Sequence, residues 1–253
     1  MIITSKNNPL VKQTSALKEK KGRKEHRLFL VEGRKMALEC VNSGFEIEKV
    51  IVSEYFSGDV SIFQDKVQLV SDDVIKHLSD EKTPQGIICL ARIPDRALQA
   101  PKGKCLFLDG VADPGNMGAI IRSANAAGYN EIYLTKECTD PYAPKSVRAS
   151  MSGIFFTTVY IADREEILNI FKTSQTPLIV ADMDGKNVFN FTPPQKFALA
   201  IGNEGNGISL QTKENAAYTV KIPMAKTQES LNAAVSAGIC MYVLNKDEFI
   251  NEN

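Results

Sequence analysis

The chain has 253 residues, of which 43% are hydrophobic and 24% are charged, and its 30 basic and 30 acidic side chains balance. These values exclude a disordered or fibrous protein and predict a globular one, with one large domain or two of ordinary size. No apolar run approaches the roughly 20 residues that span a bilayer, and the polar start of the chain is unlike a secretory signal, so we expect a cytoplasmic protein with no membrane partner.

Cysteine and histidine usage argues against a metal site and against a histidine-dependent mechanism. The five cysteines are widely spaced, and Cys89, Cys105 and Cys240 lie in or beside apolar runs, which favours buried, reduced thiols. The two histidines, His26 and His77, each lack a partner at metal-ligand spacing. We therefore predict no metal.

The first 35 residues are strongly basic. They contain ten lysines and arginines against three glutamates, a net charge of ten minus three, or +7. Such a cluster is an electrostatic footprint for phosphate backbones, and it is also common on the solvated face of a helix. The charge leans towards nucleic acid and leaves the second interpretation open.

The first ninety residues alternate between short apolar runs and amphipathic segments, which is typical of a small α/β domain. The expected strands are 28–31, 50–52, 67–70 and 86–91, and the expected helices are 33–42 and 71–78. The stretch that follows is rich in Pro, Lys, Arg and Gln, as linkers are. We therefore predict a first domain over residues 1–95, a linker over 96–104 and a second domain over 105–253.

From residue 105 the chain alternates regularly between strand and helix, which predicts a parallel sheet flanked by helices. The expected strands are 106–108, 131–134, 155–160, 178–181, 197–201 and 217–222, and the expected helices are 118–127, 144–150, 164–173, 209–215 and 230–245. Ligands of such sheets usually bind beyond the carboxyl ends of the strands. We therefore searched the segments that follow strands for polar clusters.

The first polar cluster lies in Leu108–Ala124, which reads as a strand, a turn rich in Gly, Pro and Asp, and a helix. Arg122 follows Asn116 by six residues, in a helix made mainly of small and apolar residues. A buried guanidinium there needs an anionic partner, because its desolvation is otherwise costly. An internal salt bridge meets that need, but the turn can also hold a substrate phosphate or carboxylate above the helix N-terminus.

The second cluster, Ala200–Ser209, again follows an apolar strand. Gly202, Gly205 and Gly207 permit a tight loop whose backbone can approach a ligand closely. Their spacing is not that of dinucleotide sites, which argues against a nicotinamide enzyme, and the chain has no Walker-type phosphate loop. Glycine-rich turns are most often only turns, but Glu204 in the middle of the loop favours a site.

The third cluster opens the last helix. Ser230 is the predicted N-cap, because its hydroxyl can accept a hydrogen bond from a free helical N–H, and Asn232 is predicted inside the first turn. The tight loop before them suits a ligand with an adenine edge and a carboxylate. An ordinary capped core helix explains the segment equally well.

In this order, and each at the end of a strand, the three clusters resemble motifs 1, 2 and 3 of the SpoU (TrmH-like) RNA ribose 2′-O-methyltransferases of the SPOUT superfamily, over about residues 105–245. The resemblance implies an α/β fold with a SPOUT-type parallel sheet, helices on both faces and a deep trefoil knot. Residues 1–95 are similar to the smaller L30e-like α/β domain that binds RNA in this family. The resemblance also implies a homodimer through the knotted domain and S-adenosyl-L-methionine as methyl donor.

The resemblance assigns roles by position in the motifs. Gly202, Ile222 and Leu231 would contact the cofactor. The catalytic and substrate-facing set would be Asn116, Arg122, Glu204, Ser230 and Asn232. Because a guanidinium keeps its proton in proteins, we interpret Arg122 as a phosphate ligand that orients the ribose 2′-hydroxyl and stabilises developing alkoxide charge.

The basic N-terminus and the ribose-modifying motifs together indicate RNA as the substrate, and the L30e-like domain favours 23S ribosomal RNA. Two alternatives stay open. One is the same 2′-O-methylation carried out on tRNA, and the other is a non-catalytic RNA-binding protein of ribosome assembly.

Overall fold

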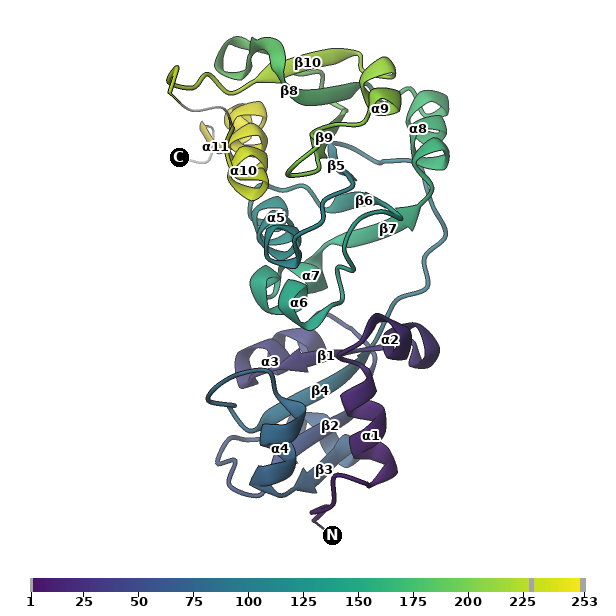
Figure 1. The fold of residues 1–253 in the computed structure, drawn as a ribbon, viewed down its shortest axis with the longest axis vertical. Helices are drawn as coiled ribbons and strands as arrows, with labels where there is room; N and C mark the ends of the chain where they lie inside the picture. The colour runs from purple at the N-terminus through teal and green to yellow at the C-terminus, as the bar shows by residue number, and fades with distance from the viewer. Residues whose placement is uncertain (1, 228–229, 251–253) are drawn as a thin grey trace. The chain divides into compact units, whose positions relative to one another are not determined.

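The computed structural model of the protein describes residues 2–227 and 230–250 and divides into two compact units (Figure 1). The first unit comprises the chain up to Asp95 together with Asp140–Phe155. The second comprises Arg96–Thr139 and the chain from Phe156 onward. Residues 140–155, which the sequence analysis had assigned to the second domain, therefore belong to the first unit. Periodicity finds the helix in this segment but does not say against which sheet it packs.

The first unit contains a four-stranded sheet in the order β1-β4-β2-β3. Its strands are β1 (Leu28–Glu32), β2 (Ile47–Ser53), β3 (Val67–Val70) and β4 (Ile87–Arg92). Strand β4 runs antiparallel to both β1 and β2, whereas β3 is parallel to β2. All four predicted strands are present, with ends that differ by up to three residues.

Helices cover this sheet, and not all of them were predicted. The helical segments are α1 (Pro9–Ala16), α2 (Lys20–His26), α3 (Arg34–Asn42), the 3₁₀ turn η1 (Ser61–Lys66), α4 (Asp72–Leu78) and α6 (Pro144–Ser150). Of these, α1, α2 and the 3₁₀ turn η1 were not predicted. Helix α1 starts because the Asn8 side chain accepts a hydrogen bond from the Leu10 N–H at 2.9 Å, and Pro9 fits the first helical position. Val11 and Leu17 then bury themselves in the core of the unit with Val74 and Leu78 of α4.

The second unit is built on a six-stranded sheet in the order β10-β8-β9-β5-β6-β7, in which every neighbouring pair is parallel. Its strands are β5 (Cys105–Asp109), β6 (Glu131–Thr135), β7 (Thr158–Ala162), β8 (Leu178–Asn187), β9 (Ala198–Gly202) and β10 (Tyr218–Lys221). The predicted parallel α/β class is confirmed. Strand β8 is longer than predicted because its last residues pair with β10 after a break in register between Thr219 and Val220.

Successive strand residues point to opposite faces of this sheet, and helices bury both faces. The helical segments are α5 (Pro114–Ala126), α8 (Arg164–Thr173), the 3₁₀ turn η2 (Val188–Asn190), α9 (Leu210–Glu214), α10 (Ala233–Leu244) and α11 (Lys246–Ile250), and the short α7 (Gly153–Phe156) joins the two units. Phe107 packs with Phe171 of α8 on one face. Helices α5 and α10 pack against each other, and Figure 1 shows them on the side of the sheet away from α8.

One predicted strand was misplaced at its start. Residues Phe155 and Phe156 belong to α7, and β7 begins only at Thr158. Aromatic residues favour strands on average, but here the backbone closes a helical turn, with the Phe155 N–H donating to the Ser152 carbonyl at 2.9 Å.

All five cysteines are buried and unpaired, as predicted. Burial raises the pKa of the Cys40 and Cys240 thiols to about 12, so these thiols stay protonated and unreactive. Among residues 2–227 and 230–250, no helix is long and apolar enough to cross a membrane.

Candidate active site

A cleft of about 650 Å³ lies in the second unit, at the carboxyl ends of β9 and β10. Its size is within the range of small-molecule sites, about 300–1,000 Å³. Six of the eight predicted site residues line it, namely Gly202, Glu204, Ile222, Ser230, Leu231 and Asn232. Asn116 and Arg122 are not among its lining residues, and each needs a separate account.

A chain of hydrogen bonds connects three of the predicted residues. The Asn116 Nδ2 donates to Glu204 Oε1 at 2.9 Å, and the Asn232 Nδ2 donates to Asn116 Oδ1 at 2.9 Å. The three side chains come from the loop after β9, the first turn of α5 and the start of α10. Motifs that are far apart in sequence therefore meet in one polar network, which we call the Glu204–Asn116–Asn232 network.

The Glu204 carboxylate occupies the N-terminus of α5. It accepts hydrogen bonds from the backbone N–H groups of Ala112 at 3.0 Å and Asp113 at 3.2 Å. The sequence analysis had allowed a substrate phosphate or carboxylate above this helix end; instead the protein supplies its own carboxylate there, next to the Asp113 cap, which accepts from the Asn116 N–H. Burial alone raises the pKa of Glu204, but the hydrogen bonds from Asn116 and the backbone outweigh it and hold the pKa below its ordinary value. Glu204 is therefore ionised at neutral pH.

The cap of α10 is Asn232, not Ser230, which corrects the sequence prediction. The Asn232 Oδ1 accepts from the N–H groups of Ala234 at 2.9 Å and Val235 at 3.2 Å, and the helix begins at Ala233. Asn caps helices as well as Ser does, so the sequence offered two candidates two residues apart. Ser230 lies before the helix, exposed at the cleft.

The loop after β9 is shaped by Asn203, a residue that the motif analysis did not select. Its Oδ1 accepts from the N–H groups of Gly205 at 2.9 Å and Asn206 at 3.0 Å, and its Nδ2 donates to the Gly110 carbonyl at 2.8 Å. A Cβ at Gly202 would overlap the backbone of Gly207, so glycine is required at position 202 for the loop to close. Asn after a strand within a glycine-rich run is a turn signal that could have identified this residue.

Arg122 is exposed on α5, which corrects the expectation of a buried guanidinium. Among the residues that the structure describes, no carboxylate pairs with it, so the internal salt bridge that a lone arginine would favour is not found. Six residues of α-helix turn by about 600°, so the Arg122 and Asn116 side chains leave α5 about 120° apart around its axis. The structure therefore does not bring Arg122 into the Glu204–Asn116–Asn232 network of its own chain.

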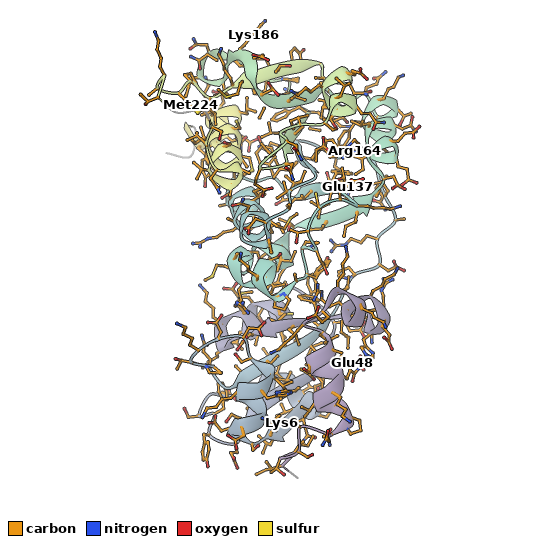
Figure 2. The ribbon with its side chains drawn as sticks, viewed as in Figure 1. Lys6, Glu48, Glu137, Arg164, Lys186 and Met224 are labelled. Carbon is orange, nitrogen blue, oxygen red and sulfur yellow. The ribbon has the colours of Figure 1, made fainter. Side chains whose placement is uncertain are left out.

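A second carboxylate, Asp109 at the end of β5, was also missed by the motif analysis. Its side chain is fully buried and accepts from Arg164 Nε at 2.7 Å, from Ser209 Oγ at 2.6 Å and from the Ser209 N–H at 3.0 Å. Burial alone raises the pKa of Asp109, but these bonds hold it below the ordinary value. Arg164 also reaches Glu137 at 3.5 Å, and both are labelled in Figure 2. Asp109 thus ties the start of α9 to β5 beneath the cleft.

One further ion pair lines the cleft. Lys213 of α9 contacts Asp182 in the middle of β8, with 2.6 Å between Nζ and Oδ2. No motif drew attention to either residue, since each stands alone in the sequence among ordinary surface charges.

The basic residues of the N-terminal segment divide into two groups. The buried Arg23 donates to Asp140 Oδ2 at 2.8 Å and to the carbonyl of Leu17 at 2.8 Å, so it holds the first unit together. In contrast, Lys20, Lys21 and Lys24 are exposed on α2. The charge run therefore combines a structural arginine with an exposed lysine face.

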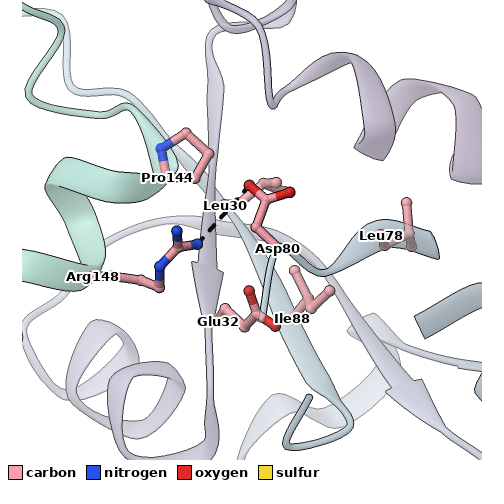
Figure 3. A pocket seen from close by; sticks show the side chains of 7 residues that line it. All are labelled: Leu30, Glu32, Leu78, Asp80, Ile88, Pro144 and Arg148. Carbon is pink, nitrogen blue, oxygen red and sulfur yellow. Dashed lines mark ion pairs between the residues drawn. The ribbon is translucent and has the colours of Figure 1, made fainter. Parts of the chain in front are cut away.

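A second, very small cavity lies in the first unit (Figure 3). It is lined by Leu30, Glu32, Leu78, Asp80, Ile88, Pro144 and Arg148. Its volume of about 10 Å³ holds one water molecule at most. Arg148 pairs with Asp80 at 4.0 Å and with Glu81 at 2.9 Å, and these ion pairs attach α6 to the rest of the first unit. The cavity is a packing feature and not a ligand site.

In the described part of the chain, no group of three or more His, Cys, Asp or Glu residues could hold a metal ion.

These features define an α/β protein with a ligand-sized cleft at the carboxyl edge of a parallel sheet. Residues 103–242 match the family model of the SpoU rRNA Methylase family, and residues 8–89 match that of the MRM3-like substrate binding domain. The first match covers more than half of the chain. The protein belongs to the SpoU rRNA methylase family.

Relatives of full length support this assignment. The chain is 29% identical to the 23S rRNA (guanosine(2553)-2′-O)-methyltransferase of Bacillus subtilis (strain 168), over 96% of this chain and 98% of that protein. A crystal structure of an RNA 2′-O ribose methyltransferase has a TM-score of 0.84 at 31% identity and covers 98% of this chain and 100% of its own. The crystal structure of an AdoMet-bound rRNA methyltransferase from Sinorhizobium meliloti has a TM-score of 0.90 at 27% identity and covers 98% of both chains.

Proposed function

We propose that this protein transfers a methyl group from S-adenosyl-L-methionine to the 2′-hydroxyl of a ribose in RNA, with 23S ribosomal RNA as the favoured substrate. The observation that carries the proposal is the Glu204–Asn116–Asn232 network at the edge of the cleft, because it joins all three family motifs in one place. The names of the full-length relatives agree with this reaction and with this class of RNA.

The cleft fits the methyl donor. Ile222 and Leu231 offer apolar contact for an adenine ring, and the tight loop at Gly202 brings backbone groups to the wall. The ionised Glu204 lines the cleft, and its negative charge favours a positively charged sulfur nearby. When bound, S-adenosyl-methionine supplies a methyl group on a sulfonium sulfur. We assign Gly202, Ile222 and Leu231 to cofactor binding.

The substrate-facing residues orient the ribose. Ser230 and Asn232 border the cleft, and Asn116 and Glu204 hold the Asn232 amide in one orientation through hydrogen bonds. Fixed polar groups of this kind lower the barrier by positioning the reacting oxygen in line with the bond that breaks. The ribose oxygen forms the new bond to the methyl carbon, the sulfur keeps the electron pair, and the hydroxyl proton passes to solvent.

Arg122 is proposed to bind the phosphate next to the target ribose. Its exposure and the lack of a carboxylate partner in residues 2–227 and 230–250 leave the guanidinium available to a ligand. A planar guanidinium pairs with phosphate through two parallel hydrogen bonds, which a lysine cannot reproduce. Because Arg122 lies outside the network of its own chain, we propose that it serves the cleft of a second chain.

We propose a homodimer formed through the second unit, as the family resemblance implies. Val235 and Tyr242, seven residues apart on one face of α10, are 51% and 46% exposed, and Tyr242 stacks on Phe249 with ring centroids 5.2 Å apart. A β-carbon at Gly238, which lies between Val235 and Tyr242 on α10, would be 3.9 Å from the hydroxyl of Ser123, the residue that follows Arg122 on α5. Light scattering of a Val235→Glu/Tyr242→Glu double variant should report a monomer. A dimer of unchanged stability would reject this face.

Mixed dimers test the placement of Arg122. Chains carrying Arg122→Ala and chains carrying Asn232→Ala should each be slower alone by about a hundredfold or more. When refolded together they should regain part of the activity, because one cleft of each mixed dimer receives both residues. Activity that stays absent in mixed dimers of confirmed composition would place Arg122 in the cleft of its own chain.

RNA binding is assigned to the predicted first domain, residues 1–95, which the predicted linker, 96–104, connects to the predicted methyltransferase domain, 105–253. The exposed lysines of α2 and the family model of a substrate binding domain support this assignment. Because the segment 140–155 packs with the first unit, point substitutions test the assignment better than deletion of residues 1–95 does. We also propose the deep trefoil knot that the resemblance implies, and a cytoplasmic location.

The reaction is tested by radiolabelled methyl transfer to ribosomal RNA and to tRNA, followed by mapping of 2′-O-methyl sites in cells with and without the protein. Label at one ribose of 23S ribosomal RNA is the expected result. Label on tRNA alone would show that the substrate is tRNA and not ribosomal RNA. No transfer to either RNA, with tight RNA binding retained, would favour a non-catalytic assembly protein.

A further inference from the structure

The Asp182–Lys213 ion pair forms part of the wall of the cleft, where the proposed methyl donor binds. Asp182 lies in the middle of β8 and Lys213 lies on α9, so two separate elements present opposite charges side by side. The Asp182 side chain is 17% exposed and that of Lys213 is 44% exposed. The pair is thus open to a ligand on one side.

Both members of the pair have hydrogen-bonding capacity to spare. Asp182 accepts from Lys213 on one oxygen and from the Asp184 N–H, at 3.3 Å, on the other, and a carboxylate offers about four acceptor positions. An ammonium group has three N–H donors, and within the described residues Asp182 is the partner found for Lys213. Burial alone raises the pKa of Asp182, but Lys213 and the backbone hold it below its ordinary value, so Asp182 is ionised at neutral pH.

The sheet order separates this pair from the reacting centre. Strand β8 is on one side of β9, and β5, which leads into the first turn of α5, is on the other. The Glu204–Asn116–Asn232 network is on the β5 side, and Asp182 is on the β8 side. No hydrogen bond among the described residues joins Asp182 or Lys213 to that network. Within the described residues, the pair therefore lies apart from the Glu204–Asn116–Asn232 network, on the β8 side of the cleft wall.

We propose that Asp182 and Lys213 bind the amino-acid end of the methyl donor, Asp182 through its α-ammonium group and Lys213 through its α-carboxylate. This inference rests on the proposed function. A zwitterion has the two charges, close together, that an ion pair complements. The ribose diol is the other polar part of the donor. It carries no charge and needs hydrogen-bond acceptors, so binding of the diol would not explain a lysine at this place.

Two ligands separate these assignments. S-adenosyl-homocysteine carries the amino-acid end, whereas 5′-methylthioadenosine has the same adenosine and thioether but lacks that end. Calorimetry measures the affinity of both compounds for the full chain without any turnover. Replacement of Lys213 by Met or of Asp182 by Asn should weaken S-adenosyl-homocysteine by about tenfold or more, as expected for the loss of one hydrogen bond between charged groups. Binding of 5′-methylthioadenosine should change by less than about twofold.

Three further variants make the result specific. Lys213→Arg keeps the charge and should restore most of the affinity for S-adenosyl-homocysteine. Lys186→Met removes the same charge from the end of β8, outside the cleft lining, and should leave both affinities unchanged (Lys186 is labelled in Figure 2). Lys221 is the other lysine of the cleft wall, and Lys221→Met tests whether it binds the carboxylate instead. Thermal unfolding of each variant shows whether the fold is retained.

Each outcome has one meaning. A selective loss for S-adenosyl-homocysteine in the Asp182 and Lys213 variants supports the proposal. Equal losses for both compounds, or a selective loss that follows Lys221 in place of Lys213, would overturn it and leave the proposed function intact. Failure of the unmodified protein to bind either compound would overturn the proposed methyl donor, and the inference with it.

Discussion

Asn232 joins the first turns of two helices, since its Nδ2 donates to Asn116 Oδ1 at 2.9 Å while its Oδ1 caps α10 through the N–H groups of Ala234 and Val235. One side chain thus stabilises a helix and orients a second polar group. These two tasks can be separated by substitution. The sequence analysis had assigned the cap to Ser230 and had placed Asn232 inside the first turn.

Replacement of Asn232 by Ser should keep the cap and lose the connection to Asn116, whereas replacement by Ala should lose both. We expect Asn232→Ser to keep the free energy of unfolding within about 0.5 kcal/mol, and Asn232→Ala to lower it by about 1 kcal/mol. Both should slow methyl transfer by about a hundredfold, as misplaced reacting groups do. Urea unfolding and single-turnover methylation measure the two effects. A Ser variant with wild-type turnover would show that the connection to Asn116 is structural only.

Asp109 predicts how stability depends on pH. Its pKa is lower in the folded protein than in the unfolded chain, so its stabilising contribution is present above the ordinary Asp value of about 3.9 and is lost as the pH falls through the lowered pKa. Asp109→Asn should reduce the free energy of unfolding by about 3 kcal/mol at neutral pH, because Arg164 loses its buried partner. The difference between variant and wild type should shrink below about pH 4. Urea unfolding at several pH values measures it, and a difference that does not change with pH would assign the effect to packing.

Much of the second unit could be predicted, because its signals are local. Apolar strands, the N-cap at Ser209 and the helix Arg164–Thr173 depend on residues close together in the chain. The site residues were found by their position in motifs, and the contacts that join them could not be. Glu204 and Asn116 are 88 residues apart, and only the parallel order of β5 and β9 brings them within 2.9 Å.

Two differences between the sequence analysis and the structure have a common physical cause. Arg122 was expected to be buried because its neighbours are small and apolar, but one face of α5 stays exposed even in such a helix. The structure groups residues 140–155 with the first unit, whereas the sequence analysis placed them in the second domain, because their helix carries no signal for its packing partner. In both cases tertiary packing determines the environment of the residues, and the periodicity of a single element does not contain that information.

Arg122 predicts a distinction between charge and geometry. Arg122→Lys keeps the positive charge and loses the planar fork, so RNA affinity should stay within about threefold while turnover falls by about a hundredfold. Because the side chain is exposed, the free energy of unfolding should change by less than about 0.5 kcal/mol. Filter binding, single-turnover methylation and urea unfolding are the measurements. Near wild-type turnover in the Lys variant would remove the need for a guanidinium.

The two groups of basic residues at the N-terminus predict opposite phenotypes. Simultaneous replacement of Lys20, Lys21 and Lys24 by Ala should leave stability unchanged and weaken RNA binding. The slope of log affinity against log salt should become shallower by about 2, since each lost phosphate contact removes about 0.7–0.9. Arg23→Met should do the reverse. It should lower the free energy of unfolding by about 3 kcal/mol, because Asp140 loses its partner, and leave the salt slope unchanged.

The matched control for the triple lysine variant is Lys172→Ala/Lys186→Ala/Lys246→Ala, which removes three exposed lysines from the second unit. An equal loss of RNA affinity in the control would show that binding follows net charge and not the α2 face.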